Sequence, residues 1–150
     1  MSRADFWCRV IGWLQVAGAL AVGTAIYAAW EFIFGWIVME NPGFFTVIKW
    51  ILIIIFAFPP FLSGLLTVVF ADRVEQAREG KRDEQHVFLR VVTALAGLWS
   101  AGVVGFVGLH VPPIGFFSVL GLATAVMAVM GADWTADLFA TRNGPGRGTA

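Results

Sequence analysis

Ionisable residues inside apolar stretches are the first candidates for chemistry in this sequence, because a charge within a membrane helix is costly and usually serves a function. Glu31 interrupts a long apolar stretch, and Lys49 lies near the start of the next one. If the first crossing continues past Glu31, the carboxylate could bind a cation or a proton. If the crossing ends near Trp30, Glu31 lies at the membrane interface and pairs with Lys49, and we favour this second interpretation.

Nucleophilic and metal-ligating residues are few. Cys8 is the only cysteine, so it cannot form an intramolecular disulfide, and no histidine lies near it in the sequence to act as a base. His86 and His110 fall at opposite membrane surfaces in the predicted topology, so they cannot bind one metal or haem together. The sequence carries no nucleotide-binding loop, nucleophile elbow or zinc motif. We therefore expect no enzyme and no metal site, while a bound lipid, quinone or pigment stays open because apolar grooves leave no sequence mark.

The composition is that of a membrane protein. Hydrophobic residues make up 59% of the 150 residues and charged residues 13%, whereas soluble domains average roughly 45–50% and 25%. Four apolar stretches, at about residues 10–38, 44–71, 87–109 and 114–132, are each long enough to cross about 30 Å of hydrocarbon as a helix. The sequence predicts an all-α, polytopic four-helix bundle in the lipid bilayer over residues 1–140, and a disordered tail over 141–150. The net charge of zero gives no reason to expect a nucleic-acid partner.

The basic residues are distributed unevenly. Nine of the ten Lys and Arg residues fall with the termini or with the polar segment between the second and third stretches, and only Lys49 falls on the other side. By the positive-inside rule, this asymmetry predicts a bacterial plasma-membrane protein with both termini and the 72–86 segment in the cytoplasm. Within that segment, Glu75 and Arg78 are spaced for a helix that continues up to a break at Gly80.

Small residues at helical spacing predict where helices approach each other closely, since there is little hydrophobic drive between helices in lipid. Three of the four stretches carry such residues on one face. They are Ala17, Ala21, Ala25 and Ala29 in the first, Gly97, Ala101 and Gly105 in the third, and Gly121 and Ala125 in the fourth.

The second stretch is bulky on all sides, and Pro59 and Pro60 predict a kink or break within it. Ser63, Thr67 or a neighbouring helix is expected to bind the carbonyl groups that the prolines leave free. The polar residues of the first and third stretches form no continuous stripe and are expected to make hydrogen bonds between helices. These are Gln15, Thr24, Thr93 and Ser100.

A faint repeat relates the two halves of the chain. Arg9-Val10-Ile11 opens the first stretch as Arg90-Val91-Val92 opens the third, and a Pro, Gly, Phe-Phe pattern opens both the second and the fourth. The matches fit a duplicated helical hairpin with a symmetry axis along the membrane normal. They also fit chance, and their shortness and unequal spacing favour chance.

Two functions of different classes fit the sequence. The first is a non-catalytic membrane subunit that packs against other membrane proteins, or against copies of itself, through its small-residue faces. The second is a small homo-oligomeric channel or transporter, with Glu31 and the Pro59-Pro60 break on its path. The lack of a polar stripe favours the first. We further expect the basic residues of the polar segment to form a docking surface for a soluble partner. These residues are Arg73, Arg78, Lys81 and Arg82.

Overall fold

The computed structural model describes residues 3–35, 42–79 and 87–140, and the described chain is almost entirely α-helical. Four helices, α1 to α4, are long and apolar enough to cross a membrane, and a short helix, α5, follows them. The all-α four-helix fold predicted from the sequence is confirmed. The bounds are Arg3–Phe34 for α1, Pro42–Arg78 for α2, Val87–Gly108 for α3, Pro112–Met130 for α4 and Ala132–Ala140 for α5.

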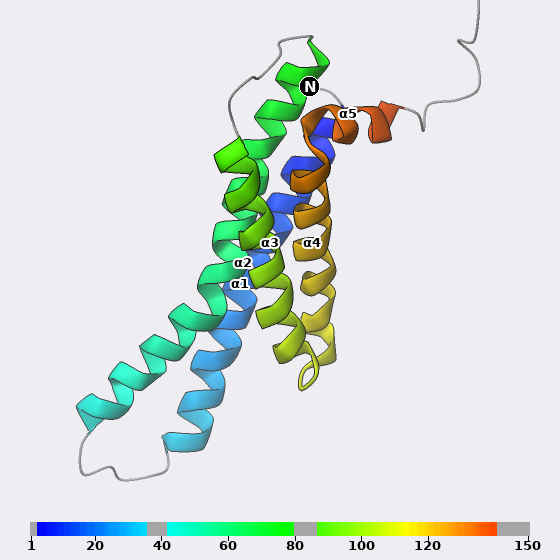
Figure 1. The fold of residues 1–150 in the computed structure, drawn as a ribbon. Helices are drawn as coiled ribbons and strands as arrows, with labels where there is room; N and C mark the ends of the chain where they lie inside the picture. Colours follow the sequence, from blue (N-terminus) through cyan, green and yellow to red (C-terminus); the bar gives the residue numbers. More distant parts are fainter. Residues whose placement is uncertain (1–2, 36–41, 80–86, 141–150) are drawn as a thin grey trace, which may run out of the picture.

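The helices form two antiparallel hairpins, α1 with α2 and α3 with α4 (Figure 1). One end of the bundle holds the start of α1, the end of α2 and helix α5, and we call it the charged end because Asp5, Arg9, Asp72 and Arg90 lie there. The other end we call the turn end. Towards the turn end the α1–α2 hairpin leans away from α3–α4 and extends beyond it (Figure 1).

Helix α2 is longer than the second apolar stretch. It begins at Pro42 and continues to Arg78, where the Glu79 amide still donates to the Glu75 carbonyl at 3.1 Å. The helical continuation expected from the Glu75 and Arg78 spacing is therefore present. Pro59 and Pro60 are both buried and lie within an unbroken helix, which changes direction near its middle (Figure 1). The structure thus shows a bend and not a break.

Each hairpin is held together by a pair of glycines. A Cβ atom placed on Gly12 would lie 2.7 Å from the Gly64 carbonyl oxygen, and one on Gly97 would lie 2.7 Å from that of Gly121. Only glycine allows the two backbones to approach so closely. The small-residue faces predicted from the sequence do not include the crossing in the first hairpin, because Gly64 lies in a stretch whose other side chains are mostly bulky.

The two crossings repeat the same contacts. Gly12 meets the backbone of Gly64 and Val68 just as Gly97 meets that of Gly121 and Ala125. The repeated segment of α2 and α4 is Gly64-Leu65-Leu66-Thr67 and Gly121-Leu122-Ala123-Thr124. The burial pattern of α2 from residue 63 to 74 matches that of α4 from 120 to 131 at most positions. The hairpins are therefore structurally equivalent, in a register different from the one suggested by the Arg and Pro-Gly matches.

Helix α5 turns across the charged end (Figure 1). Gly131 makes the turn with φ 96° and ψ 170°, a conformation open almost only to glycine. Arg90 of α3 closes the end of α4 by donating from Nε to the Ala128 carbonyl at 3.1 Å and from a terminal nitrogen to the Val129 carbonyl at 2.6 Å. Beneath α5 lies an apolar cluster that contains Cys8, Phe70, Val74 and Met127.

Candidate functional site

A group of six polar side chains lies buried between the two hairpins, each with at most 1% of its surface exposed. We call this group the polar layer. The glycine crossings position it, because Gln15 and Ser100 each follow a crossing glycine by one turn, as do Thr67 and Thr124. The members are Gln15 of α1, Ser63 and Thr67 of α2, Thr93 and Ser100 of α3, and Thr124 of α4.

Three of the six polar side chains, those of Gln15, Thr124 and Thr67, form a directed chain of hydrogen bonds. Gln15 Nε2 donates to Thr124 Oγ1 at 2.6 Å and to the Leu120 carbonyl at 3.2 Å. The Thr67 hydroxyl donates to the Ser63 carbonyl at 2.7 Å, so its only hydrogen is used. In the 2.9 Å contact between the two threonines, Thr124 must therefore be the donor and Thr67 the acceptor. The chain ties α1 to α4 and α4 to α2.

These bonds fix the orientation of the Gln15 amide. A flipped amide would point Oε1 at the Leu120 carbonyl, which is also an acceptor, so Nε2 must take that position. Oε1 is then left buried, with no hydrogen-bond partner among the described residues. An unpaired acceptor of this kind costs about 1–3 kcal/mol in proteins and needs an explanation.

Three hydroxyl groups of the polar layer are also buried without a hydrogen-bond partner in the described part of the chain. Within the described ranges, Ser63 Oγ, Thr93 Oγ1 and Ser100 Oγ are buried without a partner. Neither Ser63 nor Thr67 binds the carbonyl groups freed by Pro59 and Pro60, as had been expected, since the Thr67 hydroxyl turns to the Ser63 carbonyl. The expected bonds between helices are made by Gln15, whereas Thr24 lies exposed on the outside of α1.

The polar layer lies within the span of the membrane helices and near the charged end. At 1.5 Å per residue, Gln15 lies about 9 Å along α1 from Arg9, and Thr67 about 7.5 Å along α2 from Asp72. Arg9 binds Asp5 at 2.8 Å and also binds Asp72, so α1 and α2 are joined by ion pairs at the charged end. In the other direction an apolar cluster of Val22, Val104 and Ile114 separates the layer from the turn end.

Glu31 and Lys49 lie together near the turn end. Lys49 Nζ is 2.8 Å from Glu31 Oε1 and 4.3 Å from the centre of the Tyr27 ring. Lys49 is buried while the Glu31 side chain is half-exposed. Glu31 lies about 33 Å along α1 from Arg9, close to the thickness of a hydrocarbon core. The pair therefore fits the interfacial interpretation, since the Glu31 carboxylate is bound to Lys49.

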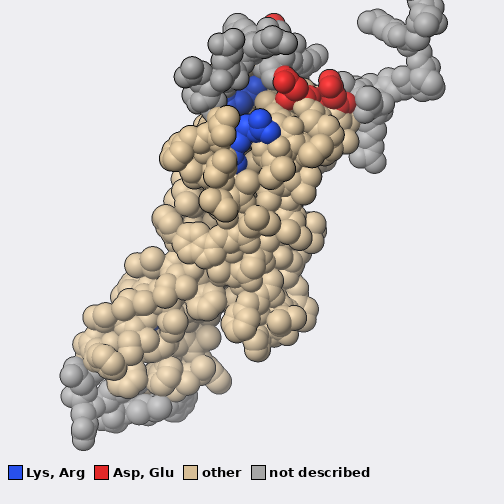
Figure 2. Space-filling view, in the orientation of Figure 1, with Lys and Arg blue, Asp and Glu red and all other residues tan. Residues whose placement is uncertain are grey.

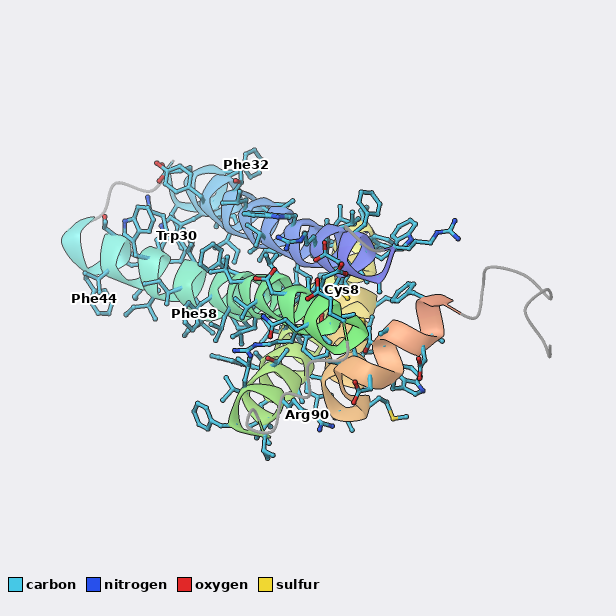
Figure 3. The ribbon with its side chains drawn as sticks, turned by 90° about the horizontal axis from the view of Figure 1, so that it is seen from above. Cys8, Trp30, Phe32, Phe44, Phe58 and Arg90 are labelled. Atoms are coloured by element: carbon cyan, nitrogen blue, oxygen red, sulfur yellow. The ribbon has the colours of Figure 1, made fainter. Side chains whose placement is uncertain are left out.

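Aromatic residues cover the α1–α2 hairpin beyond this ion pair. Trp30 lies between the two helices, with its ring centre 4.5 Å from that of Phe34 and 6.4 Å from that of Phe45 (Figure 3). Phe32 and Phe44 point outward from the hairpin and are 77% and 60% exposed (Figure 3). We call these five residues the aromatic tip. No part of α3 or α4 covers it (Figure 1).

The predicted small-residue faces divide into two groups. The predicted residues of α3 and α4 pack against each other within the chain. Gly97 contacts Gly121 and Ala125, and Gly121 contacts Ala101. A Cβ atom on Gly105 would lie 3.2 Å from Ser118 Oγ. They are not available to a partner protein. The alanines of α1 lie exposed, on a face other than the one that packs inside the bundle, and we call them the alanine stripe. They are Ala17, Ala21, Ala25 and Ala29.

Charged side chains gather at the charged end, and the other described residues on the face seen in Figure 2 are uncharged. Arg73 lies half-buried in the last turns of α2. Arg78 ends α2, and Lys81 and Arg82 lie outside the described residues. Of the four residues proposed for docking, the structure therefore describes the side chain of Arg73 alone.

Other candidates for binding are an apolar groove and isolated ligand-type residues. The groove, of about 220 Å³, opens sideways between α1 and α2 and is lined by Ala19, Ile53, Ala57 and Phe58 among others. Its lining suits a hydrocarbon chain.

His110 is exposed at the turn end, and His86 lies outside the described residues. Among the residues that the structure describes, no three His, Cys, Asp or Glu side chains form a metal-binding group.

Comparison with known proteins finds no relative: no family model, curated protein or solved structure matches the chain.

The polar layer is the feature that the sequence predicts least completely. Gln15, Thr93 and Ser100 were noted one by one, whereas Thr67 was considered only as a partner for the prolines and Thr124 was missed. The signal was present, because the Gly-Leu-x-Thr segment occurs once in each half.

Proposed function

We propose that this protein is a non-catalytic integral membrane subunit whose α1–α2 hairpin binds another membrane protein. The observation that carries the proposal is the pair of surfaces on this hairpin, the alanine stripe and the outward-facing Phe32 and Phe44 of the aromatic tip, which α3 and α4 leave uncovered.

The two surfaces suit a partner helix better than lipid alone. Alanines spaced by four allow another helix to approach closely, and close packing is the main source of association energy between membrane helices. Phe32, which follows Ala29 by three residues on α1 and is 77% exposed, supplies a large contact area beside such a seam. The faces that α3 and α4 would offer are already used within the chain, so the α1–α2 hairpin is the side on which we place the partner.

The proposal includes an orientation. We place the charged end in the cytoplasm of a bacterial cell, because Arg9, Arg73 and Arg90 lie there and Lys49 lies at the other end. The end of α2, with Arg73 and Arg78, and the polar residues after it would then face a soluble component of the same complex.

Site-specific photocrosslinking in the native membrane tests the proposal. A photoreactive benzoylphenylalanine at Ala25 should give a crosslinked product with another polypeptide, which native mass spectrometry of the gently extracted particle should also contain. The matched control carries the same group at Val126, an exposed position on α4. No product from Ala25, or equal products from both positions, would contradict a partner on the α1–α2 hairpin.

The second candidate, a small homo-oligomeric channel or transporter, is favoured by one observation. The unpaired polar atoms of the polar layer lie between two equivalent hairpins, which is where repeat-built transporters bind their substrates. Under this alternative, native mass spectrometry finds copies of this chain only. Ion or proton flux into reconstituted vesicles should then fall when Gln15 is replaced by Leu, and the Glu31→Gln variant tests the turn end separately. Absence of flux from the parent protein would reject this candidate.

A further inference from the structure

The equivalence of the two hairpins exposes one difference within the polar layer. The crossing glycines align Gly12 with Gly97, so Gln15 of α1 corresponds to Ser100 of α3. They also align Gly64 with Gly121, so Thr67 corresponds to Thr124 and Ser63 to Leu120. In one half, Gln15 of α1 forms a hydrogen bond with Thr124 of α4. In the other half, the residue equivalent to Gln15 is Ser100 of α3, and the residue equivalent to Thr124 is Thr67 of α2.

The Gln15 amide donates two hydrogen bonds across the interface, whereas the shorter Ser100 side chain carries one hydrogen and does not reach as far. Gln15 Nε2 donates to Thr124 Oγ1 and to the Leu120 carbonyl of the opposite hairpin. Ser100 has a much shorter side chain with one hydrogen, and its Oγ is buried without a partner among the described residues. Ser63 Oγ, beside the acceptor Thr67, is unpaired in the same way.

Thr67 has room for one more hydrogen bond. Its hydroxyl hydrogen goes to the Ser63 carbonyl, and one lone pair of Oγ1 accepts from Thr124, so a second lone pair is left. Because the hairpins are equivalent at their crossings, Ser100 of α3 should face Thr67 and Ser63 of α2 as Gln15 faces Thr124 and Leu120. This place would then offer one donor, Ser100, one acceptor, Thr67, and one hydroxyl that can be either, Ser63.

We propose that a water molecule is bound at this place, within the span of the membrane helices, and takes the role that the Gln15 amide has in the other half. It accepts a hydrogen bond from Ser100 Oγ and donates to Thr67 Oγ1 and Ser63 Oγ. Three such bonds are typical of a buried structural water, and they pair two of the orphan hydroxyl groups at once.

Water-edited solid-state NMR of the full chain in bilayers tests the proposal. With ¹³C-labelled serine, magnetisation from water should reach Ser63 and Ser100 rapidly. Ser118 is the matched control, because its hydroxyl already donates to the Ala101 carbonyl at 2.9 Å in the seam of the second hairpin. Transfer to Ser63 and Ser100 no faster than to Ser118 would overturn the proposal.

A substitution provides the second arm. Ser100→Gln should place an amide on Thr67, expel the water and abolish the fast transfer to Ser63. Gly102→Gln, two residues along the helix, is the control, because its side chain enters open space and should leave the fast transfer to Ser63 unchanged. Fast transfer to Ser63 that persists in a folded Ser100→Gln protein would contradict the site. If Ser100→Gln does not fold, the wild-type comparison of Ser63 with Ser118 still decides.

Discussion

Thr67 and Thr124 occupy equivalent positions in the two hairpins and share a hydrogen bond of 2.9 Å across the interface between them. Each follows its crossing glycine by three residues, so the same Gly-Leu-x-Thr segment makes the backbone contact within a hairpin and the hydroxyl contact between hairpins. The polar layer is thus the place where two glycine-packed hairpins are joined.

Removing the Gln15 amide should weaken this joint. Gln15→Leu keeps the approximate size of the side chain and loses the bonds to Thr124 and Leu120, so we expect a loss of about 0.6–1.7 kcal/mol in unfolding free energy, the range of such bonds in membrane helices. Reversible unfolding in mixed micelles measures the loss. The control is Thr24→Val on the exposed side of α1, which should leave the stability unchanged. Equal effects from the two variants would contradict a role for the Gln15 bonds.

The glycine crossings predict a strong position dependence within one helix. Gly97→Leu forces a side chain into the Gly121 backbone and should destabilise the protein by at least about 1–3 kcal/mol, the usual cost of overpacking. Gly102→Leu, five residues later, meets open space, with no atom within 4 Å of its Cβ. Unfolding in mixed micelles and the fraction of protein recovered folded from the membrane distinguish the two. A tolerated Gly97→Leu would show that the α3–α4 seam lies elsewhere.

The Glu31–Lys49 pair predicts non-additive substitutions. Glu31→Gln leaves the buried Lys49 charge with aromatic neighbours alone, whereas Glu31→Gln combined with Lys49→Met removes both charges. Removing the partner of a buried charge costs more than replacing both charged residues by uncharged ones, so the single variant should be less stable than the double variant. A double-mutant cycle on unfolding free energy measures the coupling. A coupling of zero would show that the pair is solvated.

The turn before α5 predicts a backbone effect at Gly131. Its φ of 96° and ψ of 170° are strained for any side chain, so Gly131→Ala should cost about 1–3 kcal/mol and loosen α5. Hydrogen exchange in α5 reports the local loss. Gly23→Ala is the matched substitution, because its Cβ would meet ordinary van der Waals contacts at 3.6 Å in a regular helix. Unchanged exchange in α5 of the Gly131→Ala protein would contradict the strain.

The sequence predicted those features that depend on local pattern. Hydropathy located four spans, and the spacing of Glu75 and Arg78 indicated that α2 continues beyond the apolar stretch. Which face of a helix packs, in contrast, depends on which neighbour is present. The alanine stripe and the Gly97 face look alike in sequence, yet the structure packs one and exposes the other.

The repeated Gly-Leu-x-Thr segment marks the positions of the polar layer, but which side chains pair within it could not be predicted, for the same reason. A buried threonine is unremarkable in an apolar helix until its partner is known, and Thr67 and Thr124 are far apart in sequence but hydrogen-bonded in space. The pairing of Glu31 with Lys49 could be predicted from the sequence, because charged residues are so rare in the apolar stretches that few pairings are possible.

The unequal lengths of the two hairpins have a consequence for the surrounding lipid. Helices α3 and α4 measure about 33 and 28 Å, whereas α1 and α2 measure about 48 and 55 Å. Between Arg9 and the Glu31–Lys49 pair, α1 covers about 33 Å, which already matches α3, so its additional length lies in the charged turns at one end and in the aromatic tip at the other. A bilayer that fits α3 and α4 therefore leaves the aromatic tip beyond its hydrocarbon core, and a thicker bilayer would surround the tip with lipid chains.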